Sequence, residues 1–176
     1  MPSGRTHDRL AWWSSAALFL CIGMLGRWDW AAWAGAGSLF GGLWFSGDLD
    51  TVSRPLRRWG PFAWIWRPYR ALVPHRGVHS HGLIWGPLFR SVYLVVVLVG
   101  LVAAFHAVCH LAGWHPVATV VQQGTGDLLA AGALLPAGSI TSVLGGIWFG
   151  NAVHSLSDWS VSGAKRLTRR RRRRPG

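Results

Sequence analysis

Four long stretches of the chain carry no charged residue, and segments that contain charged residues separate them. They cover residues 10–26, 30–47, 91–126 and 128–157, and contain 17, 18, 36 and 30 residues. A helix needs roughly 20 apolar residues to cross a bilayer, with about 17 as the lower limit. The pattern therefore predicts an all-α integral membrane protein with about four transmembrane helices.

The expected spans are narrower than the uncharged stretches that contain them. We expect spans at 10–26, 30–45, 91–112 and 137–157, since Gly132, Pro136 and Gly138 interrupt the last stretch before its span begins. With 176 residues, the chain has room for one domain. The sequence predicts a single membrane-embedded domain over residues 1–165 and a disordered, arginine-rich tail over 166–176.

Small residues predict which of these helices pack closely. Gly37 and Gly41 form one GxxxG pair in the second expected span, and Gly146 and Gly150 form another in the fourth. Glycines at this spacing let two helix backbones approach each other in lipid. We therefore expect the second and fourth helices to lie in close contact.

Composition supports a membrane protein. Apolar residues make up 51% of the chain and charged residues 14%, with no Glu and with thirteen Trp. These are too few charges to cover a soluble globule of this size, and Trp favours the membrane–water interface. The segment 54–90 is rich in Trp, Pro and Arg. Its prolines exclude one long helix, and we expect its indole rings to lie among lipid headgroups.

The formal charge of +12 is unevenly distributed and sets the expected orientation. The two termini and the segment between the second and third spans hold 17 of the 18 Lys and Arg residues, and Arg27 is the other. Cytoplasmic segments carry this excess. The sequence thus predicts a multi-pass membrane protein with both termini cytoplasmic. Its basic tail favours anionic lipid headgroups as a partner over nucleic acid.

Histidines and aspartates gather at the cytoplasmic ends of the expected spans. The set comprises His7, Asp8, Asp48, Asp50, His75, His81, His154 and Asp158. His154 and Asp158 are four residues apart and share a helix face. Asp48 and Asp50 follow Gly47, which suits a helix C-cap, and would point the same way in extended chain. Taken singly, each residue could be a cap, a surface group or a hydrogen-bonded pair. Placing an acidic side chain at a membrane boundary costs free energy, however, so the pattern favours a shared functional site over separate structural roles.

The chemistry that suits this set is metal binding. Mixed imidazole and carboxylate ligands suit a divalent ion, Zn before Mn or Fe, and the number of ligands allows one ion or two. Two metal ions would clamp a phosphoester substrate. Asp8 or Asp158 could serve as general base, and Arg76 could bind a substrate phosphate, although it is equally one more cytoplasmic positive charge.

Four further histidines are weaker candidates for metal ligands. His79 lies between two candidate ligands and is expected to bind nothing itself. His106, His110 and His115 lie at the outer end of the third span, where Asp127 is the nearest acid in sequence. For these three we favour packing or interfacial hydrogen bonding, and a second metal site is the alternative.

Three linked segments carry a resemblance to a known family. They are SGRTHDRL (3–10), GDLDTVSRPLRRWGPFAWIWRPYRALVPHRGVHSHG (47–82) and GNAVHSLSDWSVSGAKR (150–166). They resemble an uncharacterised bacterial family of metal-binding membrane proteins, which is similar to the YdjM-like inner-membrane metal-dependent hydrolases. The resemblance implies hydrolase activity and a metal-ligand assignment for His7, Asp48, Asp50, His75, His81, His154 and Asp158. Gly47 departs from the family pattern, which usually has Pro there.

The sequence is compatible with three functions. The first is a metal-dependent hydrolase acting on a phosphoester or a lipid headgroup at the cytoplasmic face. The second is a non-catalytic metal-binding protein, such as a sensor, store or carrier; a carrier would need acids near the bilayer midplane, where this chain has none. The third is a membrane anchor that recruits a partner or nucleic acid through its basic tail. The oligomeric state is open.

Overall fold

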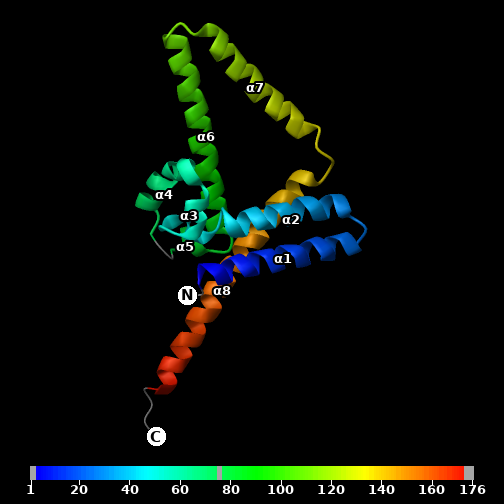
Figure 1. Ribbon diagram of the computed structural model, residues 1–176, viewed down its shortest axis with the longest axis vertical. Coiled ribbons are helices and arrows are strands. Elements are labelled where there is room, and N and C mark those ends of the chain that lie inside the picture. The colour runs from blue at the N-terminus through cyan, green and yellow to red at the C-terminus, as the bar shows by residue number, and fades with distance from the viewer. Residues whose placement is uncertain (1–2, 75–76, 173–176) are drawn as a thin grey trace. The chain divides into compact units, whose positions relative to one another are not determined.

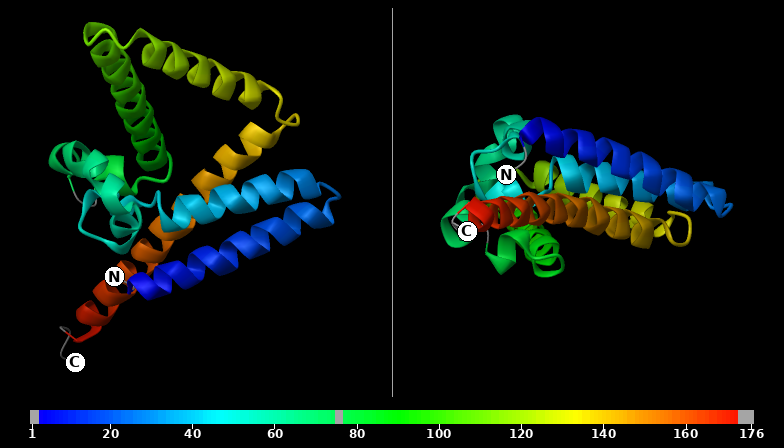
Figure 2. Two further views of the ribbon diagram at one scale, coloured as in Figure 1. Left: turned by 45° about the horizontal axis from the view of Figure 1, so that its top comes forward. Right: turned by 90° about the horizontal axis from the view of Figure 1, so that it is seen from below.

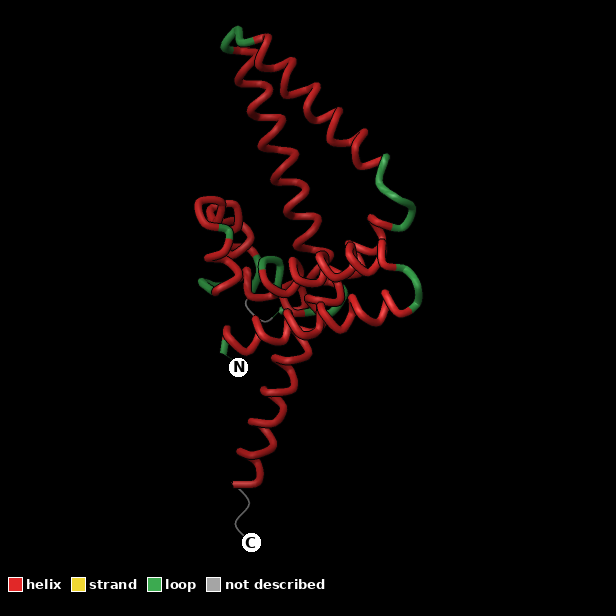
Figure 3. Tube along the Cα trace, turned by 45° about the vertical axis from the view of Figure 1, so that its right-hand side comes forward, coloured by secondary structure: helices red, strands yellow, loops and turns green. Residues whose placement is uncertain are grey.

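The computed structural model describes residues 3–74 and 77–172, and every regular element in these ranges is a helix (Figure 3). The predicted all-α class is therefore confirmed. The chain forms two compact units, one of Met1–Arg90 with Gly138–Gly176 and one of Ser91–Ala137. The single domain expected over residues 1–165 stays a prediction.

The first unit is built on three long helices that lie side by side (Figures 1 and 2). They are α1 (Gly4–Met24), α2 (Trp28–Leu43) and α8 (Ser139–Arg172). Ser3 caps α1 by accepting a hydrogen bond from the backbone N–H of Thr6. Between α1 and α2, the hydroxyls of Ser15 and Ser38 form a buried hydrogen bond of 2.7 Å. This bond gives both hydroxyl groups a hydrogen-bond partner inside an otherwise apolar interface.

The contact between α2 and α8 depends on glycine. A Cβ atom on Gly146 would lie 2.2 Å from the carbonyl oxygen of Ala34, and one on Gly41 would lie 2.4 Å from that of Ile147. Gly37 and Gly150 meet the opposite backbone equally closely. The two backbones therefore touch, and the close packing predicted from the GxxxG pairs is confirmed.

The segment between α2 and α6 folds into five short helical elements. These are η1 (Gly47–Asp50), α3 (Arg54–Arg58), η2 (Gly60–Trp66), α4 (Arg67–Leu72) and α5 (Val78–His81). Proline stands near the start of α3, η2 and α4, where its missing N–H costs nothing. Trp66 is fully buried against Phe45, Trp59 and Tyr69. The expectation that these indoles lie among headgroups is therefore wrong for Trp66, whereas Trp64 is exposed.

The second unit contains most of α6 (Trp85–Leu111) and all of α7 (His115–Ala133). The turn between them passes through Gly113, whose φ of 72° lies in the left-handed region that favours glycine. The sequence predicts no helix corresponding to α7, because Gln122, Gln123 and Asp127 interrupt its apolar pattern. The predicted break before α8 is present, with Gly138 at a φ of 87°.

The expectation of about four membrane spans is not supported. Among the described residues, only α6 is both long and apolar enough to cross a membrane, with a mean hydropathy of 2.6. α2 has 16 residues, or about 24 Å at 1.5 Å per residue, which is less than a hydrocarbon core of about 30 Å. α1 begins with charged turns, and α8 carries His154 and Asp158 in its middle.

The C-terminal part of the chain also differs from expectation. The sequence predicts a disordered tail over 166–176, whereas α8 continues as a helix to Arg172. Residues 173–176 lie outside the described part of the chain.

Candidate metal centre

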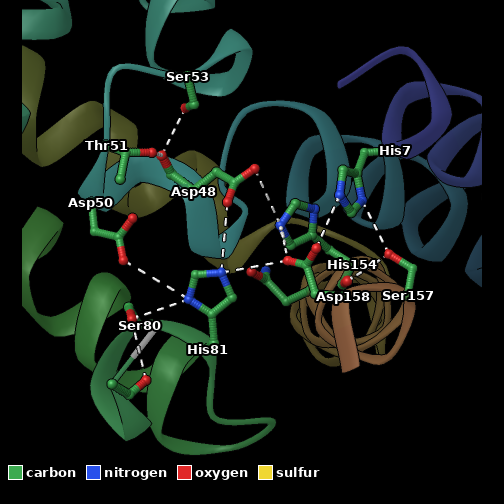
Figure 4. Close-up of polar contacts among 12 residues, drawn as sticks. His7, Asp48, Asp50, Thr51, Ser53, Ser80, His81, His154, Ser157 and Asp158 are labelled. Carbon is green, nitrogen blue, oxygen red and sulfur yellow. Dashed lines mark hydrogen bonds and ion pairs between the residues drawn. The ribbon is translucent and has the colours of Figure 1, made fainter. Parts of the chain in front are cut away.

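Three separate parts of the first unit meet at a cluster of His and Asp side chains (Figure 4). η1 supplies Asp48, α5 supplies His81, and α8 supplies His154 and Asp158. One nitrogen or oxygen from each of these four residues lies within 4.8 Å of the others. All four belong to the ligand set that the sequence predicts.

The contacts inside the cluster are too long for hydrogen bonds but suit ligands that share an ion. Nε2 of His154 lies 3.6 Å from Oδ2 of Asp48 and 3.6 Å from Oδ2 of Asp158. Nε2 of His81 lies 3.6 Å from Oδ1 of Asp48 and 3.6 Å from Oδ2 of Asp158. Two ligand atoms that are each 2.0–2.2 Å from a tetrahedral ion lie about 3.4 Å apart. The observed separations are close to that value.

The burial of these side chains supports the binding of a cation at this cluster. The side chains of His154 and Asp158 are 3% and 6% exposed. Within the described part of the chain, both ring nitrogens of His154 and both carboxylate oxygens of Asp158 lack a hydrogen bond. Buried polar atoms without hydrogen bonds are costly and rare in folded proteins. A divalent ion would satisfy Nε2 of His154 and the carboxylate oxygens of Asp158 together, so the residues present fit a metal ion.

His7 joins the edge of this cluster from α1. Its Nδ1 lies 3.1 Å from Oγ of Ser157, whose own proton is donated to the carbonyl oxygen of His154 at 2.7 Å. The serine oxygen therefore accepts from Nδ1–H of His7. This orientation turns Nε2 of His7 toward Oδ1 of Asp158, 3.3 Å away. Ser157, for which the sequence predicts no role, thus fixes the direction of a candidate ligand.

Asp50 lies on the other side of His81 from the cluster. The extended chain expected at Asp48 and Asp50 is wrong, because η1 is a 3-10 turn. As a result, Asp48 faces Nε2 of His81, while Oδ2 of Asp50 lies 3.8 Å from Nδ1. A carboxylate behind a metal-binding imidazole orients the ring and strengthens it as a ligand. Asp50 therefore lies on the side of His81 away from the four converging residues, where Oγ of Ser80 is also 3.1 Å from Nδ1, and its assignment as a metal ligand stays a prediction.

Gly47 lets η1 approach His81. The sequence suggests Gly47 as a C-cap, but α2 ends at Leu43 and its cap residue is Trp44. A Cβ atom on Gly47 would instead lie 3.1 Å from the carbonyl oxygen of Ser80 and 3.2 Å from Nε2 of His81. A side chain at this position would crowd the ligand.

A buried arginine connects the element that carries His81 to α8. Arg90 is 1% exposed and donates to the carbonyl oxygen of Ser80 at 2.6 Å and to Oδ1 of Asn151. Asn151 lies one turn before His154 and donates back to the carbonyl oxygen of Ile147 at 2.9 Å. The sequence suggests Arg90 only as a cytoplasmic charge, because its partners are distant along the chain.

The charges of the cluster perturb its titration. Burial opposes the charged form of Asp48, but contacts with His154 and His81 outweigh this and lower its pKa well below the usual range. The pKa of Asp158 is lowered in the same way, against burial, by His7 and His81. Burial would lower the pKa of His81, yet Asp158 and Asp48 raise it to about 9. The metal-free cluster therefore holds a proton on His81 at neutral pH.

The remaining predicted residues lie elsewhere or cannot be placed. Asp8 pairs with two arginines, Arg54 at 2.8 Å and Arg58 at 2.7 Å. Its expected role as general base stays a prediction. His75 and Arg76 lie outside the described residues, as does the side chain of His79.

The outer histidines form a row in the second unit. The ring centroids of His106 and His110 are 5.2 Å apart, and those of His110 and His115 are 5.1 Å apart. Among the described residues, the ligand atoms of these three do not converge within 4.8 Å as those of the first cluster do.

A cavity of about 310 Å³ adjoins the cluster. Asp48 and His154 line it together with residues from the start of α1 and from α3. The full described lining is Gly4, His7, Asp8, Gly42, Asp48, Ser53, Arg54, Pro55, Arg57 and His154. The cluster is therefore accessible from one side.

Comparison with known families agrees with this geometry. The model of a family described as uncharacterized metal-binding protein (DUF2227) matches residues 2–168. The chain belongs to this family. No match is found among curated proteins or among solved structures. The metal-binding description of the DUF2227 family fits the Asp and His cluster, and it names neither a metal nor a reaction.

Proposed function

We propose that the protein is a metal-dependent hydrolase that cleaves a phosphoester, either free or in a lipid headgroup, at the cytoplasmic face of a bacterial inner membrane. The observation that carries the proposal is the joining of the ligand cluster to a cavity. Asp48 and His154 belong to the cluster and line the cavity. Structural metal sites are closed by protein ligands, whereas catalytic sites keep a position open to substrate.

The residues divide into ligands and supporting groups. Asp48, His81, His154 and Asp158 would hold the ion, with His7 as a further ligand. Asp50 and Ser157 orient His81 and His7 from behind. A bound divalent ion supplies a Lewis acid and lowers the pKa of water. In hydrolysis, a P–O bond forms to water, the P–O bond to the leaving group breaks, and the leaving oxygen takes up a proton.

The membrane location is part of the same proposal. α6 supports it, since it is long and apolar and largely uncovered by the rest of the chain. The 17-to-1 distribution of Lys and Arg supports the cytoplasmic placement of the cluster. Resemblance to the YdjM-like inner-membrane hydrolases supports the reaction class.

Metal analysis of the purified protein tests the proposal. We expect wild type to retain Zn, Mn or Fe, and Asp48→Ala and His81→Ala to lose most of it. Asp29→Ala and His106→Ala are matched controls, because Asp29 pairs with Arg27 at the start of α2 and His106 lies in the second unit. Equal metal content in all five proteins would rule out this site.

Turnover separates a hydrolase from a non-catalytic metal-binding protein. The metal-loaded protein is assayed with bis-p-nitrophenyl phosphate, p-nitrophenyl phosphate and short-chain phospholipids. We expect activity that disappears in His154→Ala and returns on adding metal to chelator-treated wild type. A metal-loaded wild type that cleaves none of these substrates would contradict the hydrolase proposal and leave metal binding intact.

A further inference from the structure

Arg57 stands out among the residues that line the cavity beside the cluster. Its side chain is exposed, and within residues 3–74 and 77–172 its guanidinium makes no ion pair or hydrogen bond. Its neighbours Arg54 and Arg58 are both paired with Asp8. Arg57 therefore brings a positive charge without an acidic partner among the described residues to a cavity that is also lined by three candidate metal ligands, His7, Asp48 and His154.

Arg54 is held in place on the same cavity. Its Nη1 lies 2.8 Å from Oδ2 of Asp8, and its side chain is still 43% exposed. The other oxygen of Asp8 lies 2.7 Å from Arg58, which also donates to the carbonyl oxygen of Leu43 at 2.8 Å. Asp8 thus fixes two guanidinium groups, and part of Arg54 stays open to the cavity.

The start of α1 is shaped to admit Arg54. A Cβ atom on Gly4 would lie 2.6 Å from Cδ of Arg54, so glycine leaves room for the arginine stem. α1 begins at Gly4, which places the positive end of its helix dipole at the same cavity. A second cavity, of about 410 Å³, has Arg54, Arg57 and Arg58 among its lining residues.

We propose that Arg57 and Arg54 form an anion subsite that binds the phosphoryl group of the substrate beside the metal ligands. This inference rests on the proposed function and adds the residues that select the substrate. Guanidinium groups bind phosphate oxygens through paired, charge-assisted hydrogen bonds. A cavity of about 310 Å³ admits a phosphoester headgroup of a few heavy atoms and excludes a folded macromolecule.

Charge gives the subsite its selectivity. Asp48 lines the cavity and would be neutralised by a divalent ion, whereas Arg57 lines the same cavity and has no acidic partner among the described residues. A substrate anion would therefore bind between a metal ion and a guanidinium. Asp8 acts here as a positioning residue for Arg54.

Binding of inorganic phosphate to the purified full chain tests the proposal. Titration is followed by calorimetry and by 31P NMR, with and without bound metal, in wild type, Arg57→Gln, Arg57→Lys and Arg67→Gln. Arg67 is a matched control, since it is an exposed arginine in the same segment that does not line the cavity. We expect Arg57→Gln to weaken phosphate binding about 10-fold or more, because a charge-assisted hydrogen bond is lost. Arg57→Lys should restore part of the affinity, and Arg67→Gln should match wild type.

Metal content is measured in the same samples, so the two proposals fail separately. If Arg57→Gln binds metal and phosphate as wild type does, the anion subsite is wrong and the metal site stands. If wild type holds no metal and Arg57→Gln still binds phosphate more weakly than wild type, the anion subsite is supported and the proposed metal-dependent function is wrong. Equal losses in Arg57→Gln and Arg67→Gln would show a general surface charge effect and overturn the subsite.

Two competitors identify where the phosphoryl group comes from. Glycerol 3-phosphate and a short-chain phosphatidic acid are each used to displace inorganic phosphate from wild type. Displacement by both supports a site for any phosphoester, and displacement by the lipid alone supports a headgroup site. If neither displaces phosphate, the assignment to phosphoester substrates is overturned.

Discussion

Two adjacent glycines in α8 allow a sharp test of how the cluster is held. A Cβ atom on Gly146 would lie 2.2 Å from the carbonyl oxygen of Ala34 and 2.9 Å from the backbone nitrogen of Ser38. A Cβ atom on Gly145 would meet nothing within 4 Å. Alanine at either position adds the same methyl group to the same helix. Only at Gly146 does that group enter the interface with α2.

The size of the effect follows from these distances. To reach an ordinary contact of 3.4 Å from 2.2 Å, α8 would have to move away from α2 by about 1.2 Å. Overpacking of this kind costs about 1–3 kcal/mol. Both variants gain the same helix propensity, about 0.8–1 kcal/mol. The two should therefore differ in unfolding free energy by about 1–3 kcal/mol, with Gly145→Ala the more stable.

Thermal unfolding in detergent measures this difference, and metal affinity reports on the site. For a chain of this length, the thermal unfolding midpoints of the two variants should differ by about 2–4 °C for each kcal/mol of difference in unfolding free energy. Because α8 carries His154 and Asp158 and α2 leads into η1, Gly146→Ala should also bind metal about tenfold more weakly. Equal midpoints and equal metal affinities in the two variants would refute the close contact between α2 and α8.

Three further predictions concern the groups that support the ligands. Arg90→Met leaves the carbonyl oxygen of Ser80 and Oδ1 of Asn151 without this donor, and should lower the unfolding free energy by about 2–4 kcal/mol. Chemical denaturation measures this loss, and a smaller loss than in exposed Arg67→Gln would contradict the role of Arg90. Ser157→Ala should weaken metal binding about tenfold in chelator competition, because His7 loses the partner of Nδ1, whereas Ser160→Ala, an exposed serine one turn away, should leave affinity unchanged. In the metal-free protein, the raised pKa of His81 stabilises the fold fully below about pH 6.5. This contribution is lost as the pH rises through about 9, whereas that of Asp48, with its lowered pKa, is lost as the pH falls below about 4. Unfolding midpoints across roughly pH 2–10 should show both losses, and a flat profile above pH 6.5 would contradict the pairing of His81.

The gathering of ligands from distant parts of the chain was predictable because hydrophobic segments limit where their ends can lie. His7 at the start of α1, Asp48 after α2 and His154 near the middle of α8 all meet in the first unit. The glycine spacing in α2 and α8 was equally informative, since only small residues allow such an approach. These signals depend on local sequence and on helix geometry, which a single chain displays directly.

Other features depend on contacts that the sequence does not display. Asp8 looks like a candidate base beside His7, yet its oxygens contact arginines about fifty residues further along the chain. Asp48 and Asp50 look like parallel ligands, but the turn of η1 places them on opposite nitrogens of His81. The expectation of about four spans depends on treating an uncharged stretch as an apolar one, whereas polar groups shorten the apolar length of α1 and α8.

The order of the ligands along the chain has a consequence for biogenesis. The cluster needs Asp48 and His81 from the first half of the chain, and His154 and Asp158 from α8 near its end. During synthesis, residues 1–150 emerge before either ligand from α8 exists, so the early chain offers only part of a binding site. The complete set of four ligands therefore forms only after residues through Asp158 have been made and α8 has packed against α2.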